Sequence, residues 1–252
     1  EEVSLLSLST ADYCAITPLL KRLMDQYAED DVLSVSMPST RVDALSAGML
    51  EQIRRVKKSG FTIAPEAGTQ RLRDVINKNL ADQEILDACS AVFDAGWNGV
   101  KLYFMLGLPT ETEADLDGIA ALVQRIRSLS SARRKTITVS VSTLVPKPHT
   151  PFQWAEQISP AETRRRQDYL AAKLRALKVS YQFHDARLGL LEGVIARGGR
   201  ELAALLAAAW RRGCRFSAPR VGAPTAGLRR AEHGARVVKP TPTRATVSWL
   251  HR

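Results

Sequence analysis

The side chain with the clearest capacity for chemistry is Glu66, in the stretch Gly60-Phe61-Thr62-Ile63-Ala64-Pro65-Glu66-Ala67-Gly68-Thr69-Gln70-Arg71-Leu72. This pattern predicts a short buried strand that stops at a proline, presents one carboxylate and turns through a glycine into a helix. Ligands of parallel α/β folds bind at the loops after the carboxyl ends of strands, so Glu66 is a candidate binding residue. Alternatively, Glu66 only stabilises the N-terminus of the helix that begins near Thr69, where acidic residues are favoured.

Cysteines, the other residues with obvious chemical potential, give no comparable pattern. Cys14, Cys89 and Cys214 are far apart in the sequence, so neither a disulfide framework nor a metal-ligand spacing can be read from them. We interpret each cysteine as a small packing residue.

Alternating strand and helix patterns position Glu66 within an α/β fold. The expected strands are 3–9, 32–37, 61–64, 100–106, 136–145 and 179–184, and the expected helices are 16–27, 46–58, 70–76, 83–95, 112–129, 159–177, 189–196 and 200–212. The near-continuous apolar run over 100–106 is typical of a strand covered on both faces. Together the elements predict an incomplete parallel (β/α) barrel of about six strands, followed by C-terminal helices.

Capping signals mark several of the helix starts. The strongest is Ser159-Pro160-Ala161-Glu162, which combines an N-cap serine, a proline at the first helical position and a glutamate at the third. The other signals are Asp82 for the helix over 83–95, and Thr112 with Asp115, or Thr110 with Glu113, for the next.

Length and composition indicate a globular chain of 252 residues, 45% of them hydrophobic, which is enough to bury a full core. No apolar run approaches the roughly 20 residues needed to span a membrane. The first residues, Glu1 and Glu2, have the wrong charge for a signal peptide. We therefore expect a cytoplasmic protein.

The formal charge of +10 is concentrated near the C-terminus. Residues 217–252 contain seven Lys or Arg and one Glu, so this segment holds +6 and the other 216 residues hold +4. The same segment has four prolines and three glycines, and it lacks Ile, Phe, Tyr and Asp. Its composition predicts a disordered basic tail.

Three segments at successive predicted strand ends carry a family resemblance. They are Phe61-Thr62-Ile63-Ala64-Pro65-Glu66-Ala67-Gly68-Thr69, Val100-Lys101-Leu102-Tyr103-Phe104-Met105-Leu106-Gly107-Leu108-Pro109-Thr110-Glu111-Thr112 and Val145-Pro146-Lys147-Pro148-His149-Thr150-Pro151-Phe152. In this order they resemble the radical S-adenosylmethionine enzymes, over roughly residues 3–216. The chain is most similar to a bacterial subfamily with an N-terminal cobalamin-binding-like domain.

The resemblance implies an S-adenosylmethionine site that includes Glu66 and Gly68. Glu66 matches the position that contacts the ribose hydroxyls, and a carboxylate can accept two hydroxyl hydrogen bonds at once. Ser7 and Ser9 end the strand that in the family holds the methionine amino and carboxylate groups. Here the family's usual Gly-Gly-Glu is replaced by Ser7-Leu8-Ser9-Thr10.

The adenine end of the implied site falls on the next strands. Met105, Leu106 and Gly107 match the strand that packs on adenine, and Val145 matches the strand whose backbone reads the adenine edge. Ordinary core packing is the alternative role for these residues.

The chemistry implied by the resemblance is reductive cleavage of S-adenosylmethionine at a 4Fe-4S cluster, which gives a carbon radical. The family's CxxxCxxC cluster loop has no counterpart here. We therefore expect an inactive fragment that lacks this loop and any cobalamin-binding domain. Its expected parts are a partial barrel over 1–185, a helical extension over 186–216 and the tail over 217–252. A frameshift in the gene would explain the unusual composition of the tail.

Two other functions stay open. An RNA-binding or tRNA-modifying module would use basic clusters such as Arg133-Arg134-Lys135 and Arg164-Arg165-Arg166 to neutralise phosphates. A solvated surface is the simpler interpretation of both clusters, and a catalytically dead scaffold is the third possibility. His149, His184 and Asp185 lie at predicted strand ends and could contact a substrate, although structural roles are the simpler interpretation. The sequence does not identify the substrate.

Overall fold

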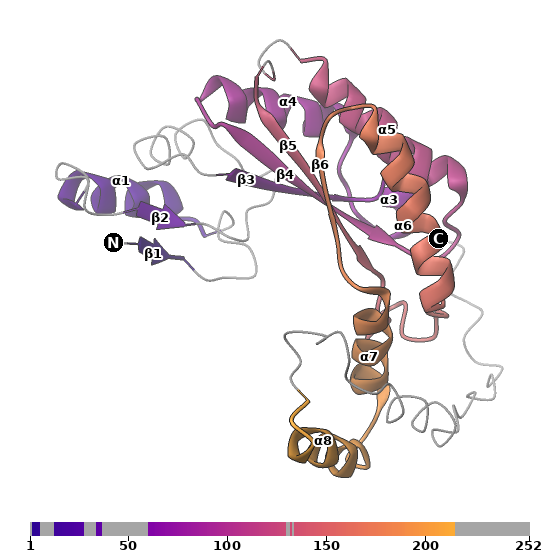
Figure 1. The fold of residues 1–252 in the computed structure, drawn as a ribbon. Helices are drawn as coiled ribbons and strands as arrows, with labels where there is room; N and C mark the ends of the chain where they lie inside the picture. The colour runs from indigo at the N-terminus through magenta and orange to yellow at the C-terminus, as the bar shows by residue number, and fades with distance from the viewer. Residues whose placement is uncertain are drawn as a thin grey trace, which may run out of the picture. The chain divides into compact units, whose positions relative to one another are not determined.

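The computed structural model describes residues 2–5, 13–27, 34–36, 60–129, 132 and 134–214, which form two parallel sheets (Figure 1). Strands β1 (Glu2–Ser4) and β2 (Ser34–Ser36) make the smaller sheet, and helix α1 (Ile16–Tyr27) lies between them in sequence. The larger sheet has the order β3-β4-β5-β6, with every neighbouring pair parallel. Its strands are β3 (Gly60–Glu66), β4 (Gly99–Leu106), β5 (Thr136–Thr143) and β6 (Ser180–Phe183).

Helices connect the strands of the larger sheet and continue after it. They are α3 (Gln70–Val75), α4 (Asp82–Asp94), α5 (Glu113–Arg127), α6 (Pro160–Arg175), α7 (Ala186–Arg197) and α8 (Leu202–Arg211). The chain divides into two compact units, residues 1–197 and 198–252, and α8 belongs to the second. Within the described ranges, no helix has the length and apolar character needed to cross a bilayer.

The predicted α/β class and incomplete parallel barrel are confirmed, although the six strands divide between two sheets. In the described part of the chain, the larger sheet ends at β3 and β6, so the barrel is open. Other expectations lie outside the described residues: the strand beyond residue 5, the helix over 46–58 and the tail over 217–252.

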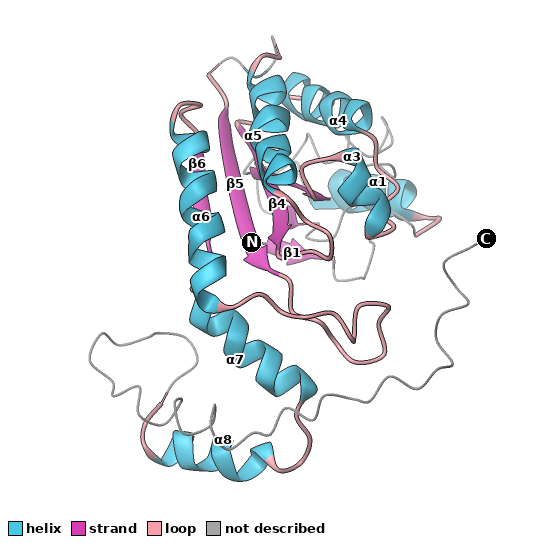
Figure 2. Cartoon of the chain, turned by 90° about the vertical axis from the view of Figure 1, so that its right-hand side faces the viewer, coloured by secondary structure: helices cyan, strands magenta, loops and turns pink. Residues whose placement is uncertain are grey.

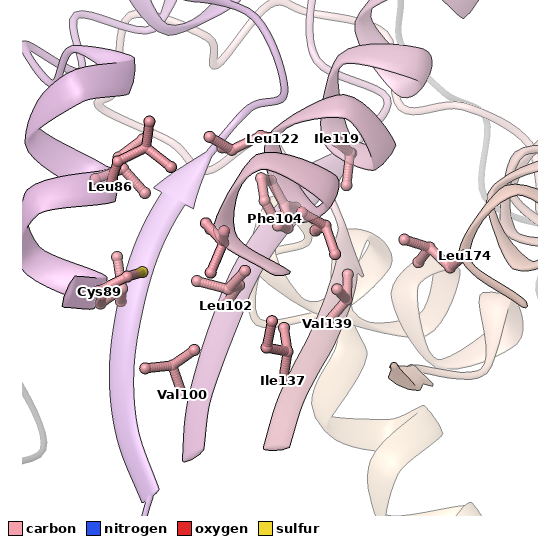
Figure 3. Close-up of a cluster of buried hydrophobic side chains, with 14 of the residues drawn as sticks. Leu86, Cys89, Val100, Leu102, Phe104, Ile119, Leu122, Ile137, Val139 and Leu174 are labelled. Carbon is pink, nitrogen blue, oxygen red and sulfur yellow. The ribbon is translucent and has the colours of Figure 1, made fainter. Parts of the chain in front are cut away.

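The main core lies between one face of the larger sheet and helices α4, α5 and α6 (Figures 2 and 3). Leu102 and Phe104 of β4 point toward this helical layer, where Cys89, Ile119 and Leu174 are also buried (Figure 3). The cluster draws on all three helices and on β3, β4 and β5. Burial of apolar area at about 25 cal/mol per Å² makes this layer the main source of stability.

Strand β4 alternates between the two faces of the sheet. Val100, Leu102, Phe104 and Leu106 are buried, whereas Lys101, Tyr103 and Met105 are only partly buried or exposed. Tyr103 is 38% exposed and the Lys101 ammonium lies 5.1 Å from the centre of its ring. The prediction that β4 is covered on both faces was wrong. Tyr103 and Met105 made the sequence look continuously apolar, but they lie on a face of the sheet that is not fully covered.

Two predicted helix starts are confirmed and one is corrected. Ser159 Oγ accepts a hydrogen bond from Glu162 N at 3.1 Å, and the Thr112 backbone N–H donates to Asp115 at 2.8 Å. Helix α4, however, has Ala81 as its N-cap residue. Asp82 is already helical and its carboxylate pairs with two arginines described below, so it does not cap the helix.

Candidate functional site

Glu66 ends strand β3 in an unusual backbone conformation. Its φ is 68°, in the left-handed region that non-glycine residues seldom adopt, and a β-bulge separates it from Ile63. The side chain is 28% exposed, and Oε1 lies 3.7 Å from the Lys78 ammonium. Burial raises the pKa of Glu66, while the nearby Lys78 ammonium acts in the opposite direction.

Lys78 reaches Glu66 because α3 ends in a Schellman turn. Asn77 has a φ of 55°; its N–H donates to Asp74 O at 3.0 Å, and the Lys78 N–H donates to Arg73 O at 2.8 Å. The turn directs the chain back toward the end of β3. The sequence pattern predicted that this helix ends near Ile76, and Lys78 was not among the candidate residues, although an asparagine after the last helical turn is a usable signal for this cap.

The cap of α3 is Thr69 rather than Glu66. Thr69 Oγ1 accepts a hydrogen bond from Leu72 N at 3.3 Å, whereas the Glu66 carboxylate faces Lys78, which follows the other end of the helix. The capping role considered for Glu66 is therefore filled by another residue. The carboxylate of Glu66 stays available to a ligand.

Gly68 allows the β3–α3 loop (residues 67–69) to pack against α5. A Cβ at Gly68 would lie 2.3 Å from Asp115 O and 2.3 Å from Ile119 N, distances that no side chain tolerates. On α5, a Cβ at Gly118 would lie 2.8 Å from Gly68 O. The structure thus gives Gly68 a packing role, and it offers a ligand only backbone groups.

Asp115 connects the β3–α3 loop to the β4–α5 loop (residues 107–112). Its side chain is 2% exposed and accepts hydrogen bonds from Thr69 Oγ1, the Arg71 guanidinium and both the N–H and the hydroxyl of Thr112. Burial alone would raise the pKa of Asp115, but the hydrogen bonds from Thr69, Thr112 and Arg71 outweigh burial and lower it. The two loops are therefore held together by an ionised carboxylate.

A second buried carboxylate, Glu111, holds the β4–α5 loop. Gly107, with a φ of 80°, donates its N–H to Glu111 at 2.7 Å, and Arg166 of α6 forms an ion pair with the same carboxylate. The Glu111 side chain is 2% exposed. Burial raises its pKa, and the Gly107 N–H and Arg166 oppose that rise.

The residues predicted to contact adenine do not share one environment. Leu106 is fully buried in the main core, so only its backbone can reach a ligand. Met105 belongs instead to a strand-end apolar cluster, which also includes Ala67, Leu72, Ile76, Leu108 and Leu144. Val145 is half-buried and lies two residues after β5. Ser7 and Ser9 lie outside the described residues.

The cysteines do not gather into a metal site. No group of three or more His, Cys, Asp or Glu within the described ranges is placed to hold a metal ion. Cys89 is buried in the main core, and burial raises the pKa of its thiol to about 12. The packing interpretation is wrong for Cys14 and Cys214, because both are exposed.

The basic cluster on α6 is largely occupied by carboxylates. Arg165 pairs with Glu162 and Glu113, and Arg166 pairs with Glu162 and Glu111. A nucleic-acid phosphate would have to displace these partners. In the other cluster, Arg133 lies outside the described residues.

Asp185 and His184 have structural partners at the end of β6. The Asp185 carboxylate accepts from the Arg187 backbone N–H at 2.8 Å and pairs with its guanidinium. The His184 carbonyl accepts from Gln167 Nε2 at 2.9 Å. The Asp185 bonds fix the start of α7 and support its structural interpretation, whereas the His184 bond involves only its backbone.

Comparison with known proteins identifies the family. Residues 2–123 match the sequence model of the Radical SAM superfamily. This part of the chain belongs to the radical SAM superfamily. The radical SAM segment contains Glu66, Gly68 and residues 105–107, together with Glu111 and Asp115; Val145 and Arg166 lie beyond it.

A protein of Methanocaldococcus jannaschii is also similar to the chain. It is named only as an uncharacterized protein and is 30% identical over 205 residues. The alignment covers 81% of this chain and 43% of the relative, so the chain spans less than half of the relative's length.

Proposed function

We propose that the described residues form the nucleoside-binding part of a radical S-adenosylmethionine enzyme. In this site the Glu66 carboxylate accepts hydrogen bonds from the ribose hydroxyls. The observation that carries this proposal is the position of Glu66. It lies within the radical SAM segment, at the carboxyl end of a parallel strand, and is partly exposed; in the described part of the chain its nearest charged partner is Lys78, 3.7 Å away.

The chemistry of the surrounding residues fits a nucleoside. An ionised carboxylate accepts two hydroxyl hydrogen bonds, and the positive charge of Lys78 favours that ionised form against the effect of burial. The strand-end apolar cluster begins at Ala67, directly after Glu66, and includes Met105 of the neighbouring strand. An apolar surface with a few polar groups is the usual lining of a small-molecule site.

The described residues do not fit the iron–sulfur cluster. Members of this superfamily use S-adenosylmethionine with a 4Fe-4S cluster to form a carbon radical, and that chemistry belongs to the cofactors. No described group of residues can ligate the cluster, so we derive no step of the radical reaction from them. The radical reaction and its substrate are proposals about the whole protein. That this chain alone is inactive is a further proposal.

Three finer predictions from the sequence stay proposals: cobalamin use, a cytoplasmic location and tRNA modification. The paired arginines of α6 favour the small-molecule function over RNA binding.

Calorimetric titration of the 252-residue chain with adenosine and with 2′,3′-dideoxyadenosine tests the role of Glu66. The two ligands differ only in the ribose hydroxyls. We expect the wild type to prefer adenosine, and Glu66→Gln to reduce this preference about tenfold, because hydrogen bonds to a charged group contribute about 1.5 to 3 kcal/mol.

Glu113→Gln is the matched control, because it makes the same change of charge at a side chain that is 57% exposed. It should keep the preference for adenosine. Failure of the wild type to bind adenosine, or an unchanged preference in Glu66→Gln, would contradict the proposed function.

A further inference from the structure

Arg73 of α3 is a fully buried charged residue, with 0% of its side chain exposed. Burying a guanidinium costs free energy unless its N–H groups are hydrogen-bonded and its charge is neutralised. A solvent-facing helix position would serve an arginine at no such cost. The placement of Arg73 therefore calls for an explanation in terms of what it holds.

All three guanidinium nitrogens of Arg73 donate hydrogen bonds. Nε donates to Leu80 O at 2.8 Å and Nη1 to Ala67 O at 3.1 Å. Nη2 donates to Gln70 Oε1 at 3.2 Å and to the Asp82 carboxylate, which neutralises the charge. One planar side chain thus joins the β3–α3 loop, the segment before α4 and the first residue of α4.

The bond to Ala67 bears directly on Glu66. Ala67 is the next residue in the chain, and the bond to its carbonyl fixes the Ala67–Gly68 peptide, one residue beyond Glu66. The φ of 68° at Glu66 is one that a glutamate seldom adopts, and such conformations persist where the surroundings enforce them. Arg73 holds the carbonyl of Ala67, and the contact of Gly68 with α5 fixes the following residue.

From these contacts we infer that Arg73 is a positioning residue for nucleoside binding: it sets the direction of the Glu66 carboxylate through Ala67. This inference rests on the proposed function of Glu66. A lysine keeps the charge but lacks the planar fork, so it cannot bond Ala67 O, Leu80 O and Asp82 in the same geometry. The conservative substitution Arg73→Lys is therefore the informative one.

A double-mutant cycle with Glu66→Gln tests the inference, with adenosine affinity of the full chain as the readout. We expect Arg73→Lys to weaken adenosine binding about fivefold when Glu66 is present and less than about twofold in the Glu66→Gln background, because coupled residues are not additive. A residue that only supports folding would give the same loss in both backgrounds. Binding of 2′,3′-dideoxyadenosine should change little in every variant.

Arg125→Lys is the matched control, because Arg125 pairs with the same Asp82 carboxylate, whereas Arg73 also bonds the β3–α3 loop. It should leave adenosine affinity unchanged. If Arg73→Lys does not fold, Asp82→Asn replaces it in the cycle, with an expected loss of about twofold that disappears in the Glu66→Gln background.

Equal losses in both backgrounds, or no loss in a folded variant, would overturn the positioning role while leaving the function of Glu66 intact. A wild type that does not distinguish adenosine from 2′,3′-dideoxyadenosine would overturn both.

Discussion

Glu66 and Glu111 follow neighbouring parallel strands, yet the structure uses the two carboxylates differently. Burial raises the pKa of each one. Glu111 is 2% exposed, and its Oε2 accepts the Gly107 N–H and pairs with Arg166. Glu66 is 28% exposed, and among the described residues it pairs only with Lys78, 3.7 Å away.

The difference shows that a carboxylate at a strand end is not enough to mark a ligand site. What separates the two is whether the protein already supplies the donors that the carboxylate needs. Glu111 receives a backbone N–H and a guanidinium, so it stabilises its loop. Glu66 has unused acceptor capacity among the described residues, which is what binding two hydroxyls requires.

The largest effect should come from breaking the Glu111 pair. Arg166→Leu leaves a buried carboxylate without its cation, so we expect the free energy of unfolding to fall by about 3 kcal/mol. Denaturant unfolding measures this loss. Arg165→Leu makes the same substitution one residue earlier, at a side chain that is 50% exposed, and should unfold like the wild type. Similar behaviour of the two variants would show that the Glu111 pair does not stabilise the fold.

The next effect concerns the packing that holds the loop after Glu66. Gly68→Ala places a methyl group 2.3 Å from two backbone atoms of α5, and we expect it to cost about 2 kcal/mol of stability through overpacking. Gly189→Ala in α7 is the control, because its methyl group meets nothing closer than 3.6 Å. It should be neutral or slightly stabilising. A stable Gly68→Ala variant would mean that α5 can move away from the loop.

Local patterns predicted much of the fold. The Ser159 cap and the alternation of elements depend on neighbours within a few residues, and both were read correctly. The strand before Glu66 was also predicted, but it continues through Pro65 to Glu66 and does not stop at the proline. The partial exposure of one face of β4 was missed, because it depends on which elements cover the sheet. The position of Glu66 at a strand end was also predictable.

The residues that hold the loop after Glu66 were not predictable in the same way. Arg73 reads as a solvent-facing helix residue, and only the tertiary structure shows that it is buried under the loop. Asp115 is recognisable as a capping residue, but its bonds to Thr69 and Arg71 join residues more than 40 positions apart. Contacts at such separations carry no local signal.

Nucleoside binding should depend on pH through Glu66 and not through Glu111. Burial raises the pKa of Glu66 above its usual 4.5. The ionised carboxylate, which accepts the hydroxyl hydrogen bonds, therefore forms only as the pH passes through this raised pKa. We expect adenosine affinity to rise about tenfold with pH across this step, the same amount that charge-assisted hydrogen bonds contribute. Titrations at several pH values should give a flat profile for Glu66→Gln. A step that persists in this variant would assign the titration to another group.

The smallest effect is the one on stability at Glu66 itself. A carboxyl whose pKa is higher in the folded state than in the unfolded state opposes folding once the pH exceeds the unfolded value, here 4.5. Glu66→Gln removes that opposition, so at about pH 7 we expect the variant to equal the wild type or exceed it by up to about 0.5 kcal/mol. Below pH 4.5 the wild-type carboxyl becomes protonated in both states, and the difference should vanish. Denaturant unfolding at both pH values measures it, and a marked loss of stability in Glu66→Gln would show that Glu66, like Glu111, mainly stabilises the fold.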